Sequence, residues 1–89
     1  MVVFQKAFVL LRVTTGKEEE VVDALMKVPE VTEAHIVPGD WDILAVVSAR
    51  KEIVLGGDEK VYRLVLDKIG KIKHVQDTHT LVSHFSKTK

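Results

Sequence analysis

The chain repeats one pattern on both sides of a glycine-containing turn, and this repeat limits the folds that it can adopt. Residues 28–37 and 72–81 align without a gap, and apolar residues, an acid and a histidine recur in step. Between the two copies, Gly39-Asp40 stands between two apolar runs. Glycine reaches positive φ without strain, so this dipeptide is typical of a two-residue β-hairpin turn. The sequence therefore predicts two strand-helix-strand units joined by a hairpin.

Periodicity and end signals place the elements within this repeat. Thr15 and Glu18 form a capping-box pattern that predicts the start of a first helix, which Pro29 ends. Asp58 is the expected cap of a second helix that Gly70 closes, after a linker over residues 51–57. The predicted strands are residues 7–13, with residues 1–6 as an extension, 31–37, 43–49 and 75–85.

The predicted order β-α-β-β-α-β defines an α+β, ferredoxin-like fold. Right-handed crossovers place the first and third strands at the centre of a four-stranded antiparallel sheet. Both helices then cover one face of that sheet. The length of 89 residues favours one domain, spanning residues 1–89.

The two central strands are apolar on both faces, although the helices can cover only one. In the first strand, Phe8 and Leu10 alternate with Val9 and Leu11, and the third strand over 43–47 is similarly apolar. An antiparallel sheet with one solvated face usually alternates apolar and polar residues. The simplest partner that can bury a second apolar face is another copy of the chain, so we expect a face-to-face homodimer or a larger ring.

The composition of the chain narrows the range of functions that it can have. The chain carries 13 basic and 13 acidic residues, interspersed, so it lacks the basic stripe expected of a protein that binds nucleic acid directly. It has no cysteine, which removes disulfides, thiol catalysis and thiolate metal sites. No apolar run has membrane-span length, and no signal-peptide layout is present, so a cytoplasmic protein is expected. The absence of asparagine, with many Glu and Lys, fits a thermophile.

The element order, the turn Gly39-Asp40-Trp41-Asp42 and the pattern over Val75 to Thr80 resemble the Lrp/AsnC ligand-binding domain, also called the RAM domain. The resemblance runs from about Ala7 to Phe85. In that family the domain normally follows a DNA-binding helix-turn-helix, for which this chain has no room before Ala7. A stand-alone form is therefore expected, with full-length regulators of the family as further partners.

The resemblance implies a non-catalytic module that binds an amino-acid effector between subunits, assembles into dimers and rings, and needs no cofactor. The site residues it implies are Gly39, Asp40, Trp41, Asp42, Thr78 and Thr80. In the predicted sheet, the hairpin turn, the start of the fourth strand and the N-terminus of the first helix share one pole. Free N–H groups there suit a carboxylate, and acidic and hydroxyl side chains suit an ammonium. The alternative is that the turn only connects two strands and that the threonines are present because threonine favours β-strands.

Two other functions are alternatives to this interpretation, and the histidines raise the question of a metal site. A structural adaptor that mixes with full-length regulators without a ligand is one alternative, and a dimeric α+β barrel enzyme is the other. The enzyme has only Arg12, Ser48, Thr80 and His84 as polar candidates, and they form no acid-base pair. His35 and His79 fall on opposite edge strands, roughly 14 Å apart at 4.8 Å per strand, too far to share a metal ion.

Overall fold

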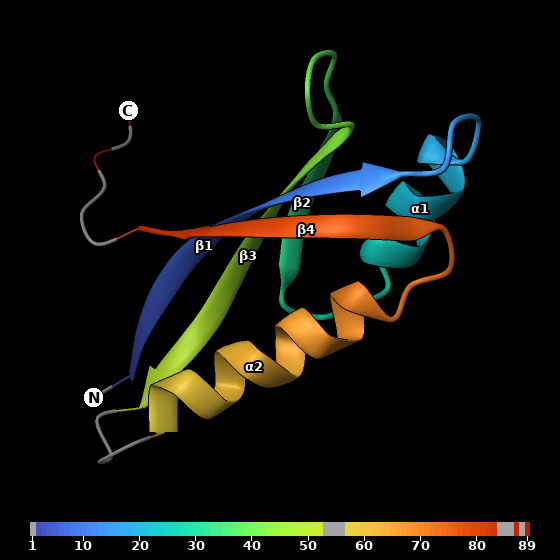
Figure 1. Cartoon of the computed structure of the whole chain (residues 1–89). Coiled ribbons are helices and arrows are strands. Elements are labelled where there is room, and N and C mark those ends of the chain that lie inside the picture. The colour runs from blue at the N-terminus through green and yellow to red at the C-terminus, as the bar shows by residue number, and fades with distance from the viewer. Residues whose placement is uncertain (1, 53–56, 84–86, 88) are drawn as a thin grey trace.

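The computed structural model describes residues 2–52, 57–83, 87 and 89, and it has the predicted order of elements (Figure 1). The helices are α1 (Glu18–Leu25) and α2 (Gly57–Gly70). The strands are β1 (Val2–Val13), β2 (Val31–Ile36), β3 (Ile43–Glu52) and β4 (Val75–Val82). Neither of these described helices is long and apolar enough to cross a membrane.

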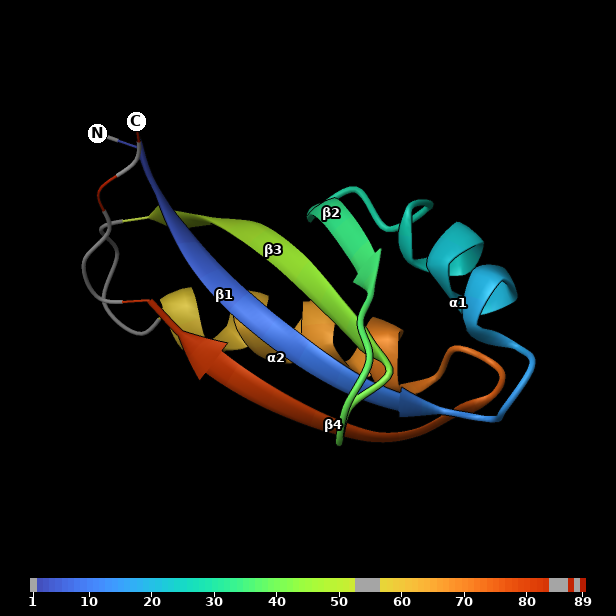
Figure 2. The ribbon, with the colours of Figure 1, turned by 90° about the horizontal axis from the view of Figure 1, so that it is seen from above.

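The strands form one antiparallel sheet in the order β2-β3-β1-β4, so the two central strands are those that the sequence predicts. Figure 2 shows α2 behind β3 and β1. The connection between β2 and β3 projects on the other side and crosses in front of β1 (Figure 2). The ferredoxin-like fold is therefore confirmed, and the hairpin lies over the face that α2 leaves open.

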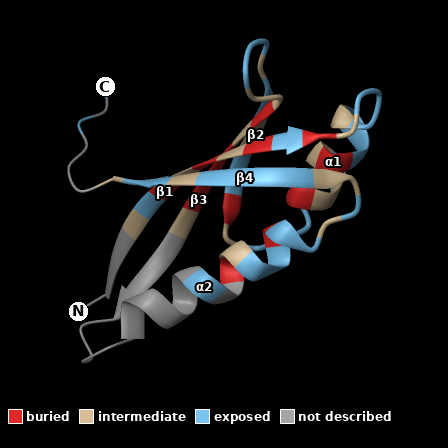
Figure 3. Cartoon of the chain, viewed as in Figure 1, coloured by how far each residue is buried: buried red, intermediate tan, exposed pale blue. Residues whose placement is uncertain are grey.

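The core forms between the helices and alternate residues of the central strands (Figure 3). Val9 and Leu11 of β1 are fully buried, as are Ile43 and Ala45 of β3. The helices bury Val21, Leu25, Val65 and Ile69 against them. Both helices contribute to the same core, so they cover the same face of the sheet, as periodicity predicts.

The opposite face of the sheet, here called the open face, is also apolar at its centre. Phe8 and Leu10 of β1 point to it and pair with Val46 and Leu44 of β3. Phe8, Leu10 and Leu44 are partly exposed, and Leu81 of β4 is 50% exposed. Strand alternation thus gives the open face the apolar surface that the sequence predicts.

The predicted start and end of the first helix are wrong. The N-cap residue is Lys17, not Thr15, and no side chain caps it. Instead, the Gly16 N–H donates to Glu18 Oε1 at 3.3 Å, so Glu18 bonds to the turn rather than to the predicted cap. At the other end α1 stops at Leu25, and a turn over residues 26–30 precedes β2.

Other predicted boundaries differ as well, and β2 stops at Ile36, one residue before the predicted Val37. Lys51 and Glu52 belong to β3, not to a linker, because β1 extends to Val2 and pairs with them. Helix α2 already includes Gly57, one residue before its expected cap. The last strand ends at Val82. Gly56 of the predicted linker and His84 and Phe85 of the predicted last strand lie outside the described residues, as do the side chains of Val61 and Leu64.

Candidate functional site

The connection between β2 and β3 is longer than the predicted two-residue turn. The Val37 N–H donates to the Asp42 carbonyl at 2.9 Å and closes a loop over residues 38–41, here called the hairpin loop. Gly39 has φ +127°, a backbone conformation that side chains with a Cβ rarely adopt. The prediction of a positive φ at Gly39 is correct, whereas the predicted length of the turn is not.

Asp42 fastens the base of the hairpin loop to β1. Its N–H donates to the Leu11 carbonyl at 2.9 Å, and its Oδ2 accepts the Val13 N–H at 2.9 Å. Val13 lies at an irregularity in the pairing with β4, where the register shifts after Arg12. The carboxylate therefore satisfies a partly buried backbone donor at this point, which is a charge-assisted and correspondingly strong bond.

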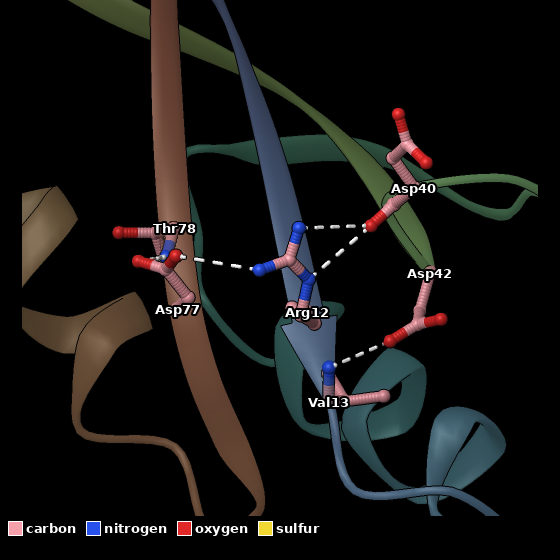
Figure 4. A network of polar contacts seen from close by, with 6 residues as sticks. All are labelled: Arg12, Val13, Asp40, Asp42, Asp77 and Thr78. Carbon is pink, nitrogen blue, oxygen red and sulfur yellow. Dashed lines mark hydrogen bonds and ion pairs between the residues drawn. The ribbon is translucent and has the colours of Figure 1, made fainter.

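Arg12 lies on the open face, in the same row as Phe8 and Leu10, and bonds to the hairpin loop at Asp40 (Figure 4). Its Nε and Nη2 donate to the Asp40 carbonyl at 3.2 Å and 3.1 Å. Its Nη1 lies 3.8 Å from Asp77 Oδ2 on β4. One guanidinium thus joins β4, β1 and the loop.

Trp41 packs into the same network. The Arg12 guanidinium carbon lies 4.6 Å from the centroid of the Trp41 ring, within cation–π range. The ring stacks on His79, with centroids 6.0 Å apart and planes inclined by 26°. His79 pairs with Leu10 across β1 and β4, so its side chain belongs to the open face. The indole of Trp41 therefore lies on the open face.

A cavity of about 540 Å³ lies between the hairpin and the start of α1. Carboxylates and apolar side chains share its lining, which consists of Gly16, Glu18, Glu19, Ile36, Val37, Pro38 and Asp42. Glu18 and Glu19 stand in the first turn of α1, where negative charge matches the helix dipole. The hairpin and the helix N-terminus therefore meet at one pole of the sheet, as the sequence predicts.

The structure separates the six predicted site residues into two groups. Gly39, Asp40 and Trp41 belong to the hairpin loop, and Asp42 forms its base and also lines the cavity. Thr78 and Thr80 pair with the buried Leu11 and Val9, so they stand on the side of β4 that faces the helices. Within one chain, the threonines and Trp41 thus point to opposite faces of the sheet.

The sequence places the start of the first helix, and with it Glu18 and Glu19, at this pole, but it does not link Arg12 to the hairpin loop. Arg12 carried a usable signal, because it interrupts the apolar row that begins with Phe8 and Leu10. Its partner on the hairpin loop is 28 residues away and no local pattern reveals it. Within the described ranges, no three His, Cys, Asp or Glu side chains converge as a metal site would require.

The bond from Asp42 to Val13 predicts a clear difference between two neighbouring acids. Asp42→Ala leaves the Val13 N–H without its acceptor, which should lower the free energy of unfolding by about 1–3 kcal/mol. Asp40 bonds to Arg12 through its backbone carbonyl, so Asp40→Ala leaves that bond in place. We expect this variant to change the free energy of unfolding by no more than about 0.5 kcal/mol. Urea unfolding of both variants at one protein concentration measures the difference. Equal destabilisation would contradict the role given to Asp42.

The described part of the chain thus combines a four-stranded sheet with two helices on one face, an open apolar face, and a hairpin loop fastened beside a cavity. The family model of the Lrp/AsnC ligand-binding domain matches residues 6–86. The chain belongs to this family, as its turn and strand motifs indicate.

Curated and structural relatives agree with this assignment. An HTH-type transcriptional regulator of Pyrococcus furiosus is 40% identical over 80 residues, covering 86% of this chain and 49% of the relative. The chain thus spans about half the length of the curated relatives it matches. The crystal structure of FFRP-DM1 is 32% identical, with a TM-score of 0.70, over 89% of this chain and 97% of that one. A feast or famine regulatory protein of M. tuberculosis, complexed with L-methionine, shares the fold, with a TM-score of 0.74, 15% identity, and coverage of 96% of this chain and 53% of its own.

Proposed function

We propose that this chain is a non-catalytic module that binds an amino-acid effector and assembles through the open face of its sheet. The observation that carries the proposal is the hairpin loop, fastened to β1 by Arg12 and Asp42, beside the cavity at the N-terminus of α1. Its membership of a ligand-binding family supports the same reading. The domain over residues 1–89 then acts as one regulatory unit, which works with cytoplasmic transcription regulators.

The chemistry of the cavity suits a small zwitterion. Glu18, Glu19 and Asp42 place negative charge on its wall, which favours the ammonium group of an amino acid. The backbone N–H groups of the loop and of the first turn of α1 suit the carboxylate. Ile36, Val37 and Pro38 offer apolar contact for an effector side chain. We propose that Gly39, Asp40 and Trp41 contribute from the loop.

Thr78 and Thr80 fit this proposal as contributions from a neighbouring subunit. Thr78 is exposed and Thr80 is partly exposed. Both lie on the edge strand β4 and point away from the hairpin loop of the same chain. An effector shared between subunits would let the hydroxyls of one chain reach the cavity of the next. The L-methionine complex of the M. tuberculosis relative supports an amino acid as the class of ligand.

Assembly through the open face follows from its composition. Phe8, Leu10 and Leu44 leave apolar surface partly exposed at the centre of the sheet. When two such faces pack together about a twofold axis, the apolar surface of both copies is buried in a single self-complementary interface. Full-length regulators that carry the same domain can use the same face, which makes them candidate partners.

A thermal-shift panel of the twenty amino acids tests the ligand-binding part of the proposal. A ligand that binds the folded state stabilises it by RT ln(1 + [L]/Kd), which is about 2.7 kcal/mol at a hundredfold excess over Kd. We expect one amino acid or a chemically related set to raise the melting temperature. A flat panel would favour the adaptor function, in which the chain assembles without a ligand.

We also expect this chain by itself not to bind duplex DNA. Its 13 basic and 13 acidic residues give a net charge of zero, so it can release few counterions from the phosphate backbone. Gel shifts with protein at low micromolar concentration and low salt measure this directly. Retarded DNA that is released by added salt would contradict the prediction.

A further inference from the structure

One residue outside the cavity is bonded on both sides of a segment that forms part of the cavity wall. Three lining residues lie within residues 16–19, and Thr14 and Glu20 stand on either side of them. His74, in the turn between α2 and β4, contacts both flanking residues. Figure 1 and Figure 2 both show this turn beside the loop between β1 and α1. Residues 14–20, here called the wall segment, are therefore held from a turn that does not line the cavity.

The backbone of His74 holds the first end of the wall segment. The Thr14 N–H donates to the His74 carbonyl at 3.0 Å, and the Gln76 amide donates to the Thr14 hydroxyl at 3.4 Å. His74 has φ +78°, a conformation that is uncommon for a residue with a Cβ, although histidine and asparagine adopt it more often than most. Such a conformation persists where the surrounding structure determines it. The carbonyl that receives the Thr14 bond thus belongs to a residue with a specially determined backbone.

The side chain of His74 holds the other end of the wall segment. Its Nε2 lies 3.0 Å from Oε2 of Glu20, in the first turn of α1. The His74 side chain is 21% exposed and that of Glu20 is 62% exposed. A contact to so exposed a carboxylate adds little to stability. It nevertheless fixes the start of a helix whose N-cap residue, Lys17, makes no side-chain capping bond.

We propose that His74 is a positioning residue that raises the affinity for the effector by holding the wall segment in its binding conformation, an inference that rests on the proposed function. His74 is not among the residues that line the cavity. A segment that is ordered before binding does not have to be ordered by the ligand, so less of the binding free energy is lost. The His74 ring therefore contributes to affinity without touching the effector.

His74→Asn is the variant that tests this role, because it removes the ring and keeps the backbone. Asparagine adopts positive φ readily, so the bond from the Thr14 N–H to the carbonyl of residue 74 is retained. The melting temperature should stay within about 4 °C of wild type, as for a surface substitution in a domain of this size. Lys68→Gln is the matched control. It breaks the 3.4 Å ion pair between Lys68 and Glu30, which does not involve the wall segment.

Calorimetry with the amino acid that gives the largest shift in the thermal panel measures the affinities. We expect His74→Asn to bind it about threefold to tenfold more weakly than wild type does, and Lys68→Gln to stay within about twofold. The expected pattern is thus a loss of affinity without a matching loss of stability. Wild-type affinity in His74→Asn would overturn the proposal, as would an equal loss of affinity in Lys68→Gln.

A double-mutant cycle with Glu20→Ala tests whether the contact itself carries the effect. His74→Asn and Glu20→Ala break the same contact, so the double variant should lose no more affinity than the weaker-binding single variant. Losses that multiply in the double variant would show that the two residues act independently and would overturn the role given to their contact.

Hydrogen exchange without ligand measures the wall segment directly. Peptides that cover residues 14–20 should exchange faster in His74→Asn than in wild type and Lys68→Gln, because the contact that orders the segment is lost. Equal exchange in all three proteins would contradict the positioning role.

The positioning role and the proposed function fail in different ways. If the wild type binds an amino acid and His74→Asn binds it equally well, the positioning role is refuted and the proposed function stands. If no amino acid binds, the proposed function fails, and the role of His74 in affinity fails with it.

Discussion

Replacing Leu10 with glutamate is expected to abolish assembly and leave a particle of the chain mass, 10.0 kDa. Leu10 stands at the centre of the open face, between Leu44 of β3 and His79 of β4. Burying an unpaired carboxylate at an interface costs on the order of 3–5 kcal/mol. This corresponds to roughly a hundredfold to several thousandfold in the dissociation constant. Light scattering coupled to size exclusion, at micromolar protein, measures the mass.

Met26→Glu is the matched control for this prediction. Met26 is 50% exposed and follows α1, away from the open face, so the same gain of charge should leave assembly unchanged. Circular dichroism spectra of the wild-type kind are expected for both variants and check that they fold. A wild-type mass equal to that of one chain, or a Leu10→Glu protein that still assembles, would refute the role of the open face.

Replacing Gly39 with valine is expected to remove most of the effector affinity while the sheet remains folded. At φ +127° a residue with a Cβ is strained by about 1–3 kcal/mol, and branching at Cβ makes the strain worse. A Cβ built at Gly39 meets no atom within 4 Å, so the backbone conformation alone resists the change. The loop should relax to another conformation and lose the orientation of its donors. An effector affinity lowered about tenfold or more corresponds to 1.4 kcal/mol or more.

Gly70→Val provides the comparison for the glycine substitution. A Cβ at Gly70 also meets no atom within 4 Å, and its φ is not in the positive range. This variant should bind the effector as the wild type does. Calorimetry on the three proteins gives the affinities. Equal affinity in Gly39→Val and wild type would remove Gly39 from the site.

The arrangement of strands could be predicted because burial repeats with a short period. Val9 and Leu11 alternate with Phe8 and Leu10, and this two-sided pattern identifies β1 as a central strand with two apolar faces. The sheet order then follows from the handedness of the crossovers. Both inferences depend only on neighbours in the sequence and on general rules of packing.

The details of the site could not be predicted because distant residues determine them. The hairpin loop is held by Arg12 and Asp42, whose partners are 28 and 29 residues away. A two-residue turn was expected because Gly39-Asp40 favours one locally. The face of β4 on which Thr78 stands depends on its pairing with Leu11, beyond a register shift that the sequence does not reveal. At Thr15, a competing bond from the Gly16 N–H to Glu18 replaced the expected cap.

The most direct test of the account is a calorimetric titration of the wild-type protein with the amino acid selected by the thermal-shift panel. We expect saturable binding that approaches one ligand per chain. In a Thr80→Val variant the affinity should fall by a few-fold to about tenfold, as expected for one lost hydroxyl contact. Equal affinity in Thr80→Val would remove Thr80 from the site but leave the module a ligand-binding one. The absence of saturable binding for all twenty amino acids at millimolar concentration would contradict the account.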